Sequence, residues 1–411
     1  MWRAERLGRL GVCLVLGAAV AWFASGCADT TEETFTQPGI QLIVTPDTAT
    51  IFHREPSLNP DGFTVIFSTD WPFDPEIDDD KNARDIAVIN IPSNLRPYPT
   101  TSMPDTLTEA AFRKVVFGTL TSDLSTGGTV QFDPNIRGKS QPVWNPTNGS
   151  QFAVVIQNSD RRDRIYLCDV DLSQSDAVPV TSAHFIGNPQ GKEYFFNDPA
   201  WSHDGQWLLF SRYYYKPGSA TAVPPIPDVF EPQAVFAMNV NTEEVYQLTS
   251  GSSKEGDCAW APSGRTIVFT SNRGVGGTNG RDLYLIDFDP DAPGAVLDLN
   301  MRRLTFANND GIGPSFLPEE NFDPTWSPDG GSIVFVSTRR NMTTSLRDRS
   351  LWIMDGDGSN QRELVFTRQD EVNPSYDPNS SNRLVYASAD SPIEAFKGQR
   401  NDIWLDYDFQ Q

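Results

Sequence analysis

The sequence predicts an all-β protein built from six repeated units of four short strands each, and three observations lead to this prediction. The first is composition, because 38% of the 411 residues are hydrophobic, 11% are aromatic and 31 are prolines. Such a chain can bury a large core but is rich in turn formers, which favours many short strands over long helices. The second is a phrase that recurs six times, and the third is a lone strand-like segment at residues 39–45.

The recurring phrase contains proline or a small residue, then an aromatic residue, a Pro/Asp/Gly turn and a short β-branched run. Its copies begin at Pro56, Pro142, Pro199, Cys258, Pro324 and Pro374. A further strand follows each copy, beginning at Asp85, Arg164, Ala234, Asp282, Ser350 and Asp402, and several units close with one more, as at Val245, Met301 and Gln361. Counting the strand that carries the aromatic residue, each unit has four strands.

The turn of the repeat has a clear physical basis in the copy Ser327-Pro328-Asp329-Gly330. Proline presets φ, aspartate can bond its own backbone, and glycine accepts a positive φ. The run IVFVS that follows is almost entirely apolar, as expected for a strand buried on both faces between stacked sheets. We therefore expect a six-bladed β-propeller of four-stranded blades, with residues 39–45 supplying the missing strand of the last blade and closing the ring.

The aromatic position of the repeat is expected to be structural. It is occupied by Trp144, Trp201, Trp260 and Trp326, with Leu58 and Tyr376 in the other two units. These positions are 50 to 86 residues apart, slightly long for blades of four strands, so the excess is assigned to loops. Recurrence in every unit favours packing between blades over ligand binding.

The repeats resemble the WD40-like repeats of the TolB-type propeller. The closest copy is Trp326-Ser327-Pro328-Asp329-Gly330 with Ser337-Thr338-Arg339 and the later Met354 to Asn360 (MDGDGSN), and the resemblance covers most of residues 39–411. It implies the propeller fold and is weak as an indication of function.

The N-terminus predicts export and a lipid anchor. Residues 1–26 have a basic start and an apolar run closed by small residues, the form of a secretory signal. Ala24-Ser25-Gly26-Cys27 resembles a lipobox, so Cys27 is the expected lipidation site, residues 27–38 a flexible tether and residues 39–411 the propeller. The residue after the cysteine is Ala28, which favours the outer membrane. The alternative is an ordinary cleavage site with an accidental cysteine.

Charge and cysteine content narrow the partners further. The formal net charge of −22 argues against nucleic acid and anionic lipid surfaces, so membrane contact is expected through the anchor only. Cys168 and Cys258 fall in non-neighbouring units and are expected to be buried thiols, not a disulfide.

One polar residue lies three positions before each repeat aromatic. The set is Glu55, Gln141, Asp198, Asp257, Asp323 and Asn373, and six-fold symmetry would place it as a ring near one mouth of the channel. One interpretation is that these groups bond the backbone or the repeat arginines Arg212, Arg273 and Arg339, because buried carboxylates are normally paired. The other is a site for a cation, with Ca²⁺ possible, or for a basic peptide end.

Two longer segments are candidates for a binding face. One carries Trp71 and Phe73 before an acidic run at 74–85, and the other is a loop from Tyr213 to Gln233 that opens with Tyr213, Tyr214 and Tyr215. Exposed aromatic side chains suit binding surfaces, although they could instead cover hydrophobic blade edges. The acidic runs at 74–85 and 287–291 are expected to be solvated loops without a calcium site, and residues 92–139 an insertion or a degenerate seventh blade.

Signatures of common enzymes are missing from the sequence. It contains no Gly-x-Ser-x-Gly elbow, phosphate loop, Cys-x-x-Cys pair or His-Glu-x-x-His helix, and it has three histidines, of which His203 lies in a repeat turn. The leading hypothesis is therefore a non-catalytic module that binds an envelope protein or a cell-wall polymer and needs no cofactor. Two alternatives stay open: a carbohydrate-active or lactone-cleaving propeller enzyme that uses carboxylates and Ca²⁺, and a small-ligand sensor.

Overall fold

The computed structural model describes residues 40–42, 51–71, 73, 84–91, 112–117, 138–157, 162–186, 194–216, 229–274, 280–306, 319–339, 349–365, 370–389 and 401–407. All of them belong to one compact unit, residues 38–411. Their regular structure is β-strand, so the all-β prediction is confirmed for these ranges. None of them forms a helix that is long and apolar enough to cross a membrane. The predicted signal, Cys27 and the tether lie outside the described residues.

The strands form five antiparallel or mixed sheets. The largest has eight strands in the order β2 (His53–Leu58), β3 (Thr64–Thr69), β4 (Asp85–Asn90), β5 (Phe112–Val116), β9 (Ala177–Phe185), β8 (Asp163–Val170), β7 (Asn148–Gln157) and β6 (Lys139–Asn145). Two four-stranded sheets follow: β10 (Tyr194–Trp201), β11 (Trp207–Lys216), β12 (Val229–Asn239) and β13 (Val245–Gln247), then β14 (Glu255–Trp260), β15 (Thr266–Ser271), β16 (Asp282–Asp287) and β17 (Arg302–Arg303). The last two are β18 (Asn321–Trp326), β19 (Ser332–Ser337), β20 (Ser350–Asp355) and β21 (Arg362–Val365), and β1 (Ile40–Gln41), β24 (Asn401–Tyr407), β23 (Ser380–Ala389) and β22 (Asp370–Asp377).

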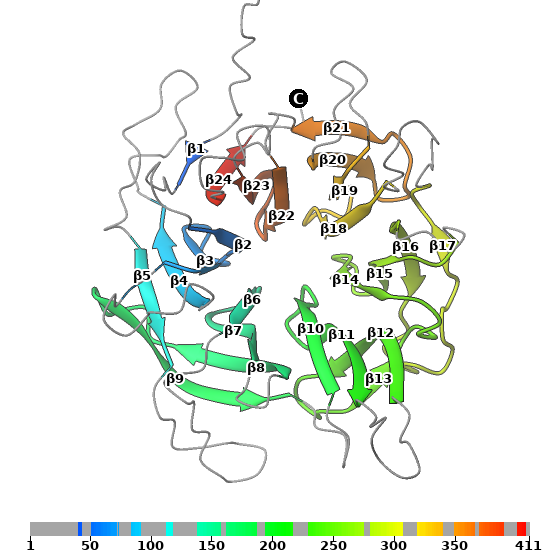
Figure 1. The fold of residues 1–411 in the computed structure, drawn as a ribbon, viewed down its shortest axis with the longest axis horizontal. Coiled ribbons are helices and arrows are strands. Elements are labelled where there is room, and N and C mark those ends of the chain that lie inside the picture. Colours follow the sequence, from blue (N-terminus) through cyan, green and yellow to red (C-terminus); the bar gives the residue numbers. More distant parts are fainter. Residues whose placement is uncertain are drawn as a thin grey trace, which may run out of the picture. The chain divides into compact units, whose positions relative to one another are not determined.

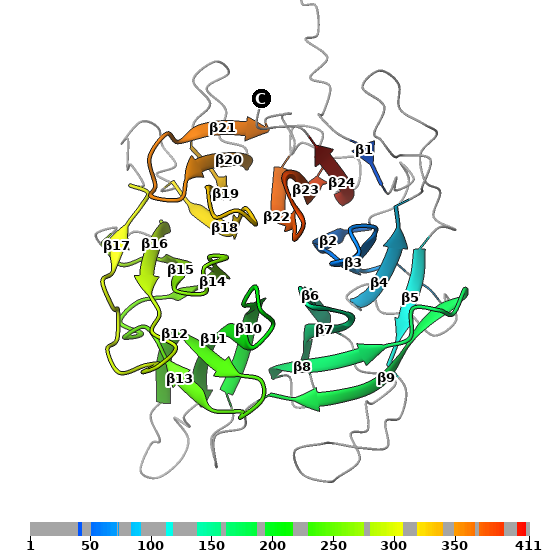
Figure 2. The same ribbon diagram turned by 180° about the vertical axis from the view of Figure 1, so that it is seen from behind.

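The sheets stand around a central axis as the blades of a β-propeller do (Figures 1 and 2). The innermost strands are β2, β6, β10, β14, β18 and β22, and each of them contacts the next around the circle, with β22 returning to β2. Six separate four-stranded sheets were expected, but the described strands form four such sheets and one sheet of eight.

The eight-stranded sheet arises because its two outermost strands pair with each other. β5 runs parallel to β9 with Val115 opposite Val178, and so joins the run β2–β5 to the run β6–β9. Asp85 strengthens this junction through Lys114 on β5, at 2.7 Å between Oδ2 and Nζ, and Lys139 on β6, at 2.6 Å between Oδ1 and Nζ. Within residues 92–139, β5 and the first residue of β6 are the strand residues that the structure describes.

The strand near the N-terminus completes the last sheet, as the sequence predicted. β1 pairs antiparallel with β24, with Ile40 opposite Leu405, and the Leu42 N–H donates to the carbonyl of Ile403 at 2.7 Å. Of the seven residues expected, 39–45, the structure describes residues 40–42, and β1 covers two of them. The two ends of the chain therefore share one sheet, which removes its open edge.

The predicted hairpin turn is present between β18 and β19. The Gly330 N–H donates to the carbonyl of Ser327 at 2.9 Å, and Gly330 has φ +73°, which glycine accepts without steric cost. The Ser327 hydroxyl donates to Oδ1 of Asp329 at 2.6 Å and accepts from the Ser332 N–H at 2.9 Å. These bonds fix the inner hairpin of the sheet and hence the position of the axis-facing strand.

The core lies between neighbouring sheets. Every residue of β3 is buried, as are all but the first of β15 and of β19, which agrees with strands covered on both faces. The repeat tryptophans belong to these layers: the Nε1–H of Trp201 donates to the carbonyl of Val143 in the preceding sheet, and that of Trp260 to Ala200, each at 3.2 Å. Cys168 and Cys258 are buried free thiols, as predicted.

Candidate functional site

The structure brings the six polar residues of the repeat together around the axis. Glu55, Gln141, Asp198, Asp257, Asp323 and Asn373 line one cavity of about 210 Å³. The two residues that follow each of them complete its wall. We call this space the acidic cavity, and each of the six residues is half-buried there.

A β-bulge in each innermost strand turns these side chains toward the axis. The pairing of the innermost strand with its neighbour shifts at this point in all six cases, for example between Asn197 and Ala200 in β10. All six residues have a positive φ, between 43° and 58°. This conformation costs a non-glycine residue about 1 kcal/mol or more and is common at binding sites, although its recurrence in every sheet also makes it part of the repeat.

Hydrogen bonds run around the ring from one sheet to the next. The Gln141 N–H donates to Oε2 of Glu55 at 2.6 Å, and the Asp198 N–H to Oε1 of Gln141 at 2.9 Å. The Asp257 N–H donates to Oδ2 of Asp198 at 3.2 Å, and Nδ2 of Asn373 to Oδ2 of Asp323 at 2.9 Å. The side chains are therefore held in place by the backbone and amides of neighbouring sheets.

Hydroxyl groups on the second strand of three sheets also bind the ring. Oγ of Ser68 and Oγ of Ser211 each donate at 2.7 Å, to Oε2 of Glu55 and Oδ2 of Asp198. Oγ1 of Thr270 donates at 2.9 Å to Oδ2 of Asp257. Several lone pairs of the ring carboxylates are thus already used.

The expectation that Arg212, Arg273 and Arg339 pair with the ring is wrong. Arg273 forms ion pairs with Glu255 and Asp298, while the guanidinium groups of Arg212 and Arg339 lie over aromatic rings of their own sheets.

The arginine that reaches the ring is Arg281, which immediately precedes β16. Its Nη1 lies 3.2 Å from Oδ2 of Asp257, and its Nη2 lies 3.5 Å from Oε2 of Glu320, the residue just before β18. Sequence reasoning missed Arg281 because it lies outside the repeated phrase.

The three aspartates come from consecutive sheets and affect one another's protonation. Burial, followed by the charge of Asp257, raises the pKa of Asp198 to about 6. The same two causes raise the pKa of Asp323 to about 8, although Arg281 acts in the opposite direction. Carboxylates that repel each other in a confined space are typical of sites that hold a proton or a cation.

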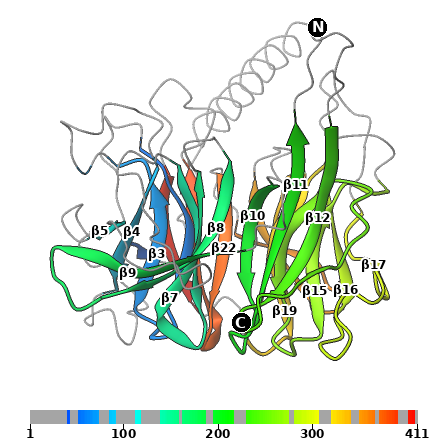
Figure 3. The ribbon, with the colours of Figure 1, turned by 90° about the horizontal axis from the view of Figure 1, so that it is seen from below.

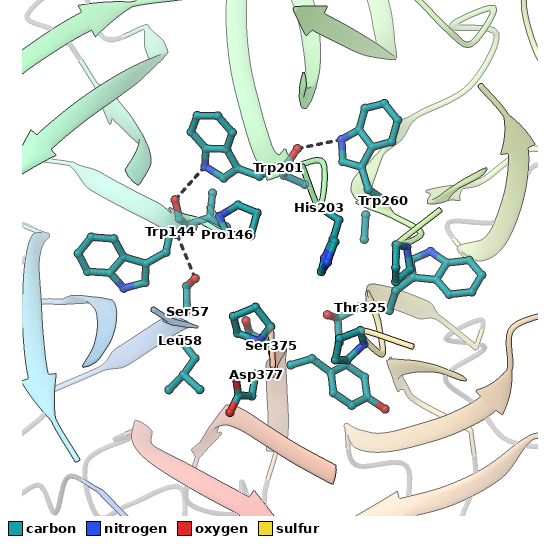
Figure 4. A pocket seen from close by; sticks show the side chains of 18 residues that line it. Ser57, Leu58, Trp144, Pro146, Trp201, His203, Trp260, Thr325, Ser375 and Asp377 are labelled. Atoms are coloured by element: carbon teal, nitrogen blue, oxygen red, sulfur yellow. Dashed lines mark hydrogen bonds between the residues drawn. The ribbon is translucent and has the colours of Figure 1, made fainter. Parts of the chain in front are cut away.

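A second cavity, of about 180 Å³, adjoins the acidic cavity along a ring of shared residues that we call the waist, and Figure 4 shows the side chains that line this second cavity. The two cavities share the residue that precedes each repeat aromatic: Ser57, Val143, Ala200, Ala259, Thr325 and Ser375. All six side chains are small. The second cavity is also lined by His203 and by turn prolines such as Pro146, so we call it the proline–histidine cavity.

The aromatic residues proposed for a binding face divide into two groups. Trp71 and Phe73 each contact the ring of Phe112 edge-on, at 5.7 and 5.8 Å between centroids, and pack against a buried cluster. Tyr214 packs in the same way against Tyr194. These three cover hydrophobic surface.

The other two aromatic residues, Tyr213 and Tyr215, are more accessible for contact with a partner. Tyr213 stacks on the half-buried Phe195, with 4.8 Å between centroids, and Tyr215 is exposed. The expected loop from Tyr213 to Gln233 was wrong in part, because Tyr213 to Lys216 belong to β11 and the chain from Val229 onward to β12. Figure 3 shows this long hairpin reaching beyond its neighbours.

No metal site is visible within the described ranges, where no three His, Cys, Asp or Glu side chains are grouped so as to hold an ion. The acidic run at 287–291 lies among the described residues, so the absence of such a group applies to it as well. Of the run at 74–85, residues 74–83 lie outside the described residues.

Comparison with known proteins gives resemblances of fold. No protein-family model and no curated protein matches the chain. Among solved structures, it is similar to a protein described as TolB from Agrobacterium tumefaciens, with 15% identity over 87% of this chain and 90% of that one and a TM-score of 0.47. It is also similar to an α-L-arabinofuranosidase from Fusarium graminearum (14% identity, 91% and 98%, TM-score 0.49) and an oligogalacturonate lyase from Vibrio parahaemolyticus (13%, 89% and 92%, TM-score 0.44).

Proposed function

We propose that this chain is a non-catalytic binding protein of the bacterial cell envelope, which binds an envelope protein or a cell-wall polymer through a positively charged amine. The proposal counts the eight-stranded sheet as two blades, β2–β5 and β6–β9, so that the propeller has six. The observation that carries it is the row of Asp198, Asp257 and Asp323 on one side of the acidic cavity.

A bound ammonium group would relieve the repulsion among these carboxylates. The raised pKa values of Asp198 and Asp323 mean that the ring holds negative charge at a cost, which a cation in the cavity offsets. A primary ammonium has three donors and no acceptor, and so complements a wall of carboxylate and amide oxygens. The net charge of −22 would also attract a basic partner to the protein.

Calcium is a competing occupant, but the geometry favours an amine. The described residues contain no group arranged as a metal site, and the ring oxygens already accept bonds from Ser211, Thr270 and Gln141. Calcium needs six to eight oxygen ligands. A rise in melting temperature with Ca²⁺ that chelation reverses would favour the ion over the amine.

Isothermal titration of the exported chain with n-butylamine tests the proposal. We expect the double variant Asp198→Asn/Asp323→Asn to bind at least tenfold more weakly, because it removes two of the three adjacent carboxyl groups that can become charged beside a bound ammonium. The matched control is Asp176→Asn/Asp291→Asn, which removes two exposed carboxylates and should bind normally. Equal binding by both variants would show that the amine does not occupy the ring.

The envelope location and the partner need experiments in cells. Mass spectrometry of the mature N-terminus should find lipid on Cys27. A photo-crosslinking residue at Tyr215, which is 40% exposed on the hairpin formed by β11 and β12, should attach to one defined partner. The same probe at Phe306, which is 63% exposed beside the outermost strand β17, is the control and should not attach to it.

A second candidate is an enzyme of the carbohydrate-active or lactone-cleaving kind. The observation that favours it is the pKa of about 8 for Asp323, which leaves this carboxyl protonated at neutral pH and able to act as a general acid. Turnover of a glycan or lactone that Asp323→Asn abolishes, while binding persists, would replace the binding proposal.

A further inference from the structure

The proline–histidine cavity has a wall unlike that of the acidic cavity. It is lined by the residue two places after five of the six repeat aromatic positions, and four of these five residues are prolines: Pro146, Pro262, Pro328 and Pro378. In the sheet that begins with β10, the same position is His203. Proline rings present apolar CH groups, so this part of the wall is apolar except at His203.

His203 lines this cavity together with the hydroxyl-bearing residues Ser57, Thr325 and Ser375. It is exposed, and Figure 4 shows its imidazole pointing toward the centre of the space, whereas the tryptophan rings lie further out, between the sheets. Asp377 also lines the cavity, but it is buried and its Oδ2 lies 3.1 Å from Nη1 of Arg383. The cavity therefore combines apolar proline and aromatic side chains with a few polar groups, one of them an imidazole, which is the usual composition of a small-molecule pocket.

Its size suits one small ring. The volume is about 180 Å³. An apolar cavity of about 150 Å³ is large enough to hold benzene. A single six-membered or fused ring would fit, and a long chain or a folded segment would not.

The waist connects this space to the acidic cavity. Each of its six residues lines both cavities, and none is larger than valine. Because the same six residues line both cavities, the two spaces meet at this ring. A charged group in the acidic cavity and a ring in the proline–histidine cavity can thus be joined by one short linker.

We propose that the group entering the channel is an amine joined by a short chain to a planar ring, with the amine in the acidic cavity and the ring in the proline–histidine cavity. The amine half rests on the function proposed above, and the ring half rests on the second cavity alone.

Titration with 4-phenylbutylamine and with n-butylamine tests the ring half. Burial of the phenyl ring predicts that the exported chain binds 4-phenylbutylamine at least tenfold more tightly than n-butylamine. Binding of both amines with equal affinity would overturn this inference and leave the proposed function standing. If neither amine bound, the proposed function itself would fail.

Variants at the waist locate the ring. Ala259→Leu narrows the waist and should abolish the advantage of the phenyl compound while n-butylamine binds as before. Ala259→Ser is the matched control, because Ser57 and Ser375 occupy the same position in other sheets, and it should keep the advantage. An unchanged advantage in Ala259→Leu would show that the ring binds elsewhere.

A second variant avoids the risk that leucine at the waist disturbs folding. His203→Pro introduces the residue that four other sheets carry at this position, so the turn should be retained. With 4-(4-hydroxyphenyl)butylamine, whose hydroxyl can bond the imidazole, we expect a loss of about fivefold to tenfold in affinity. The affinity for 4-phenylbutylamine should change less, and equal losses for both compounds would count against a ring beside His203.

Discussion

The two ends of the axial channel are made by the same repeat and carry opposite chemistry. Three places before the repeat aromatic, the backbone bulges and presents acids and amides, and two places after it, a tight turn presents proline. The backbone therefore sets where a side chain points, and the residue at each position sets what the cavity can bind. Departures from the repeat, such as the three adjacent aspartates and His203, mark where function is expected.

A comparison within the ring explains why equivalent aspartates differ. Asp198 receives a hydrogen bond from Ser211, which is paired across the sheet with Asn197, the residue just before Asp198. At the corresponding position beside Asp323 stands Val336, which has no hydroxyl to offer. A carboxylate with fewer donors is harder to ionise, in agreement with the higher pKa of Asp323.

The largest effect is expected from Asp323→Asn. Because the folded chain raises the pKa of Asp323 from 3.8 to about 8, the folded state holds this proton more tightly than the unfolded state. Its contribution to stability is full below pH 3.8 and is lost as the pH rises through 8. The variant cannot ionise, so its melting temperature at pH 8 should exceed that of the parent chain by on the order of 5 °C.

Melting curves from pH 4 to pH 8 check this prediction and separate the two aspartates. The difference between Asp323→Asn and the parent chain should shrink toward pH 4. Asp198→Asn should show a smaller gain that stops growing near pH 6, because the pKa of Asp198 is about 6, whereas the gain of Asp323→Asn should grow up to about pH 8. A difference that does not depend on pH would contradict the ionisation argument.

A smaller effect of the opposite sign is expected from Arg281→Gln. This change removes the positive charge that lies 3.2 Å from Asp257, and leaves the row of carboxylates without its counter-ion. We expect a loss of about 1 to 2 kcal/mol in the free energy of unfolding at pH 8, since the pair is partly exposed, and a smaller loss at pH 5. Urea denaturation measures both, and Arg302→Gln on the exposed strand β17 is the control. A loss of equal size at both pH values would argue that Arg281 acts through packing on Phe322 instead.

Much of this architecture could be read from the sequence, because the repeat encodes it in every copy. The position of the polar ring follows from one residue per unit at a constant distance from the aromatic, and the turn follows from Pro, Asp and Gly. The pairing of β5 with β9 could not be predicted, because outer strands have short, variable sequences and their partners are set by packing.

The electrostatics of the site were less accessible to sequence reasoning. Arg281 reaches the ring from outside the repeated phrase, and a charged residue between two motifs gives no sign of which carboxylate it will meet. The positive φ of the ring residues had one possible indication in the sequence, because a proline follows the ring residue in five of the six copies. A proline at this position is equally compatible with an ordinary edge strand that has no bulge. The burial that raises the pKa values depends on all the sheets at once.

The smallest effect concerns the tryptophans, which the repeat makes equivalent and the structure does not. Nε1 of Trp201 bonds the carbonyl of Val143 at the waist, whereas the buried Nε1 of Trp144 has no partner among the described residues. Replacing either by phenylalanine removes similar buried area, but only Trp201→Phe also breaks a hydrogen bond. We therefore expect Trp201→Phe to lower the free energy of unfolding by about 1 kcal/mol more than Trp144→Phe, measured by urea denaturation. Equal losses would mean that the contact between neighbouring sheets depends on the packing of the indole ring, and that the waist keeps its shape without this bond.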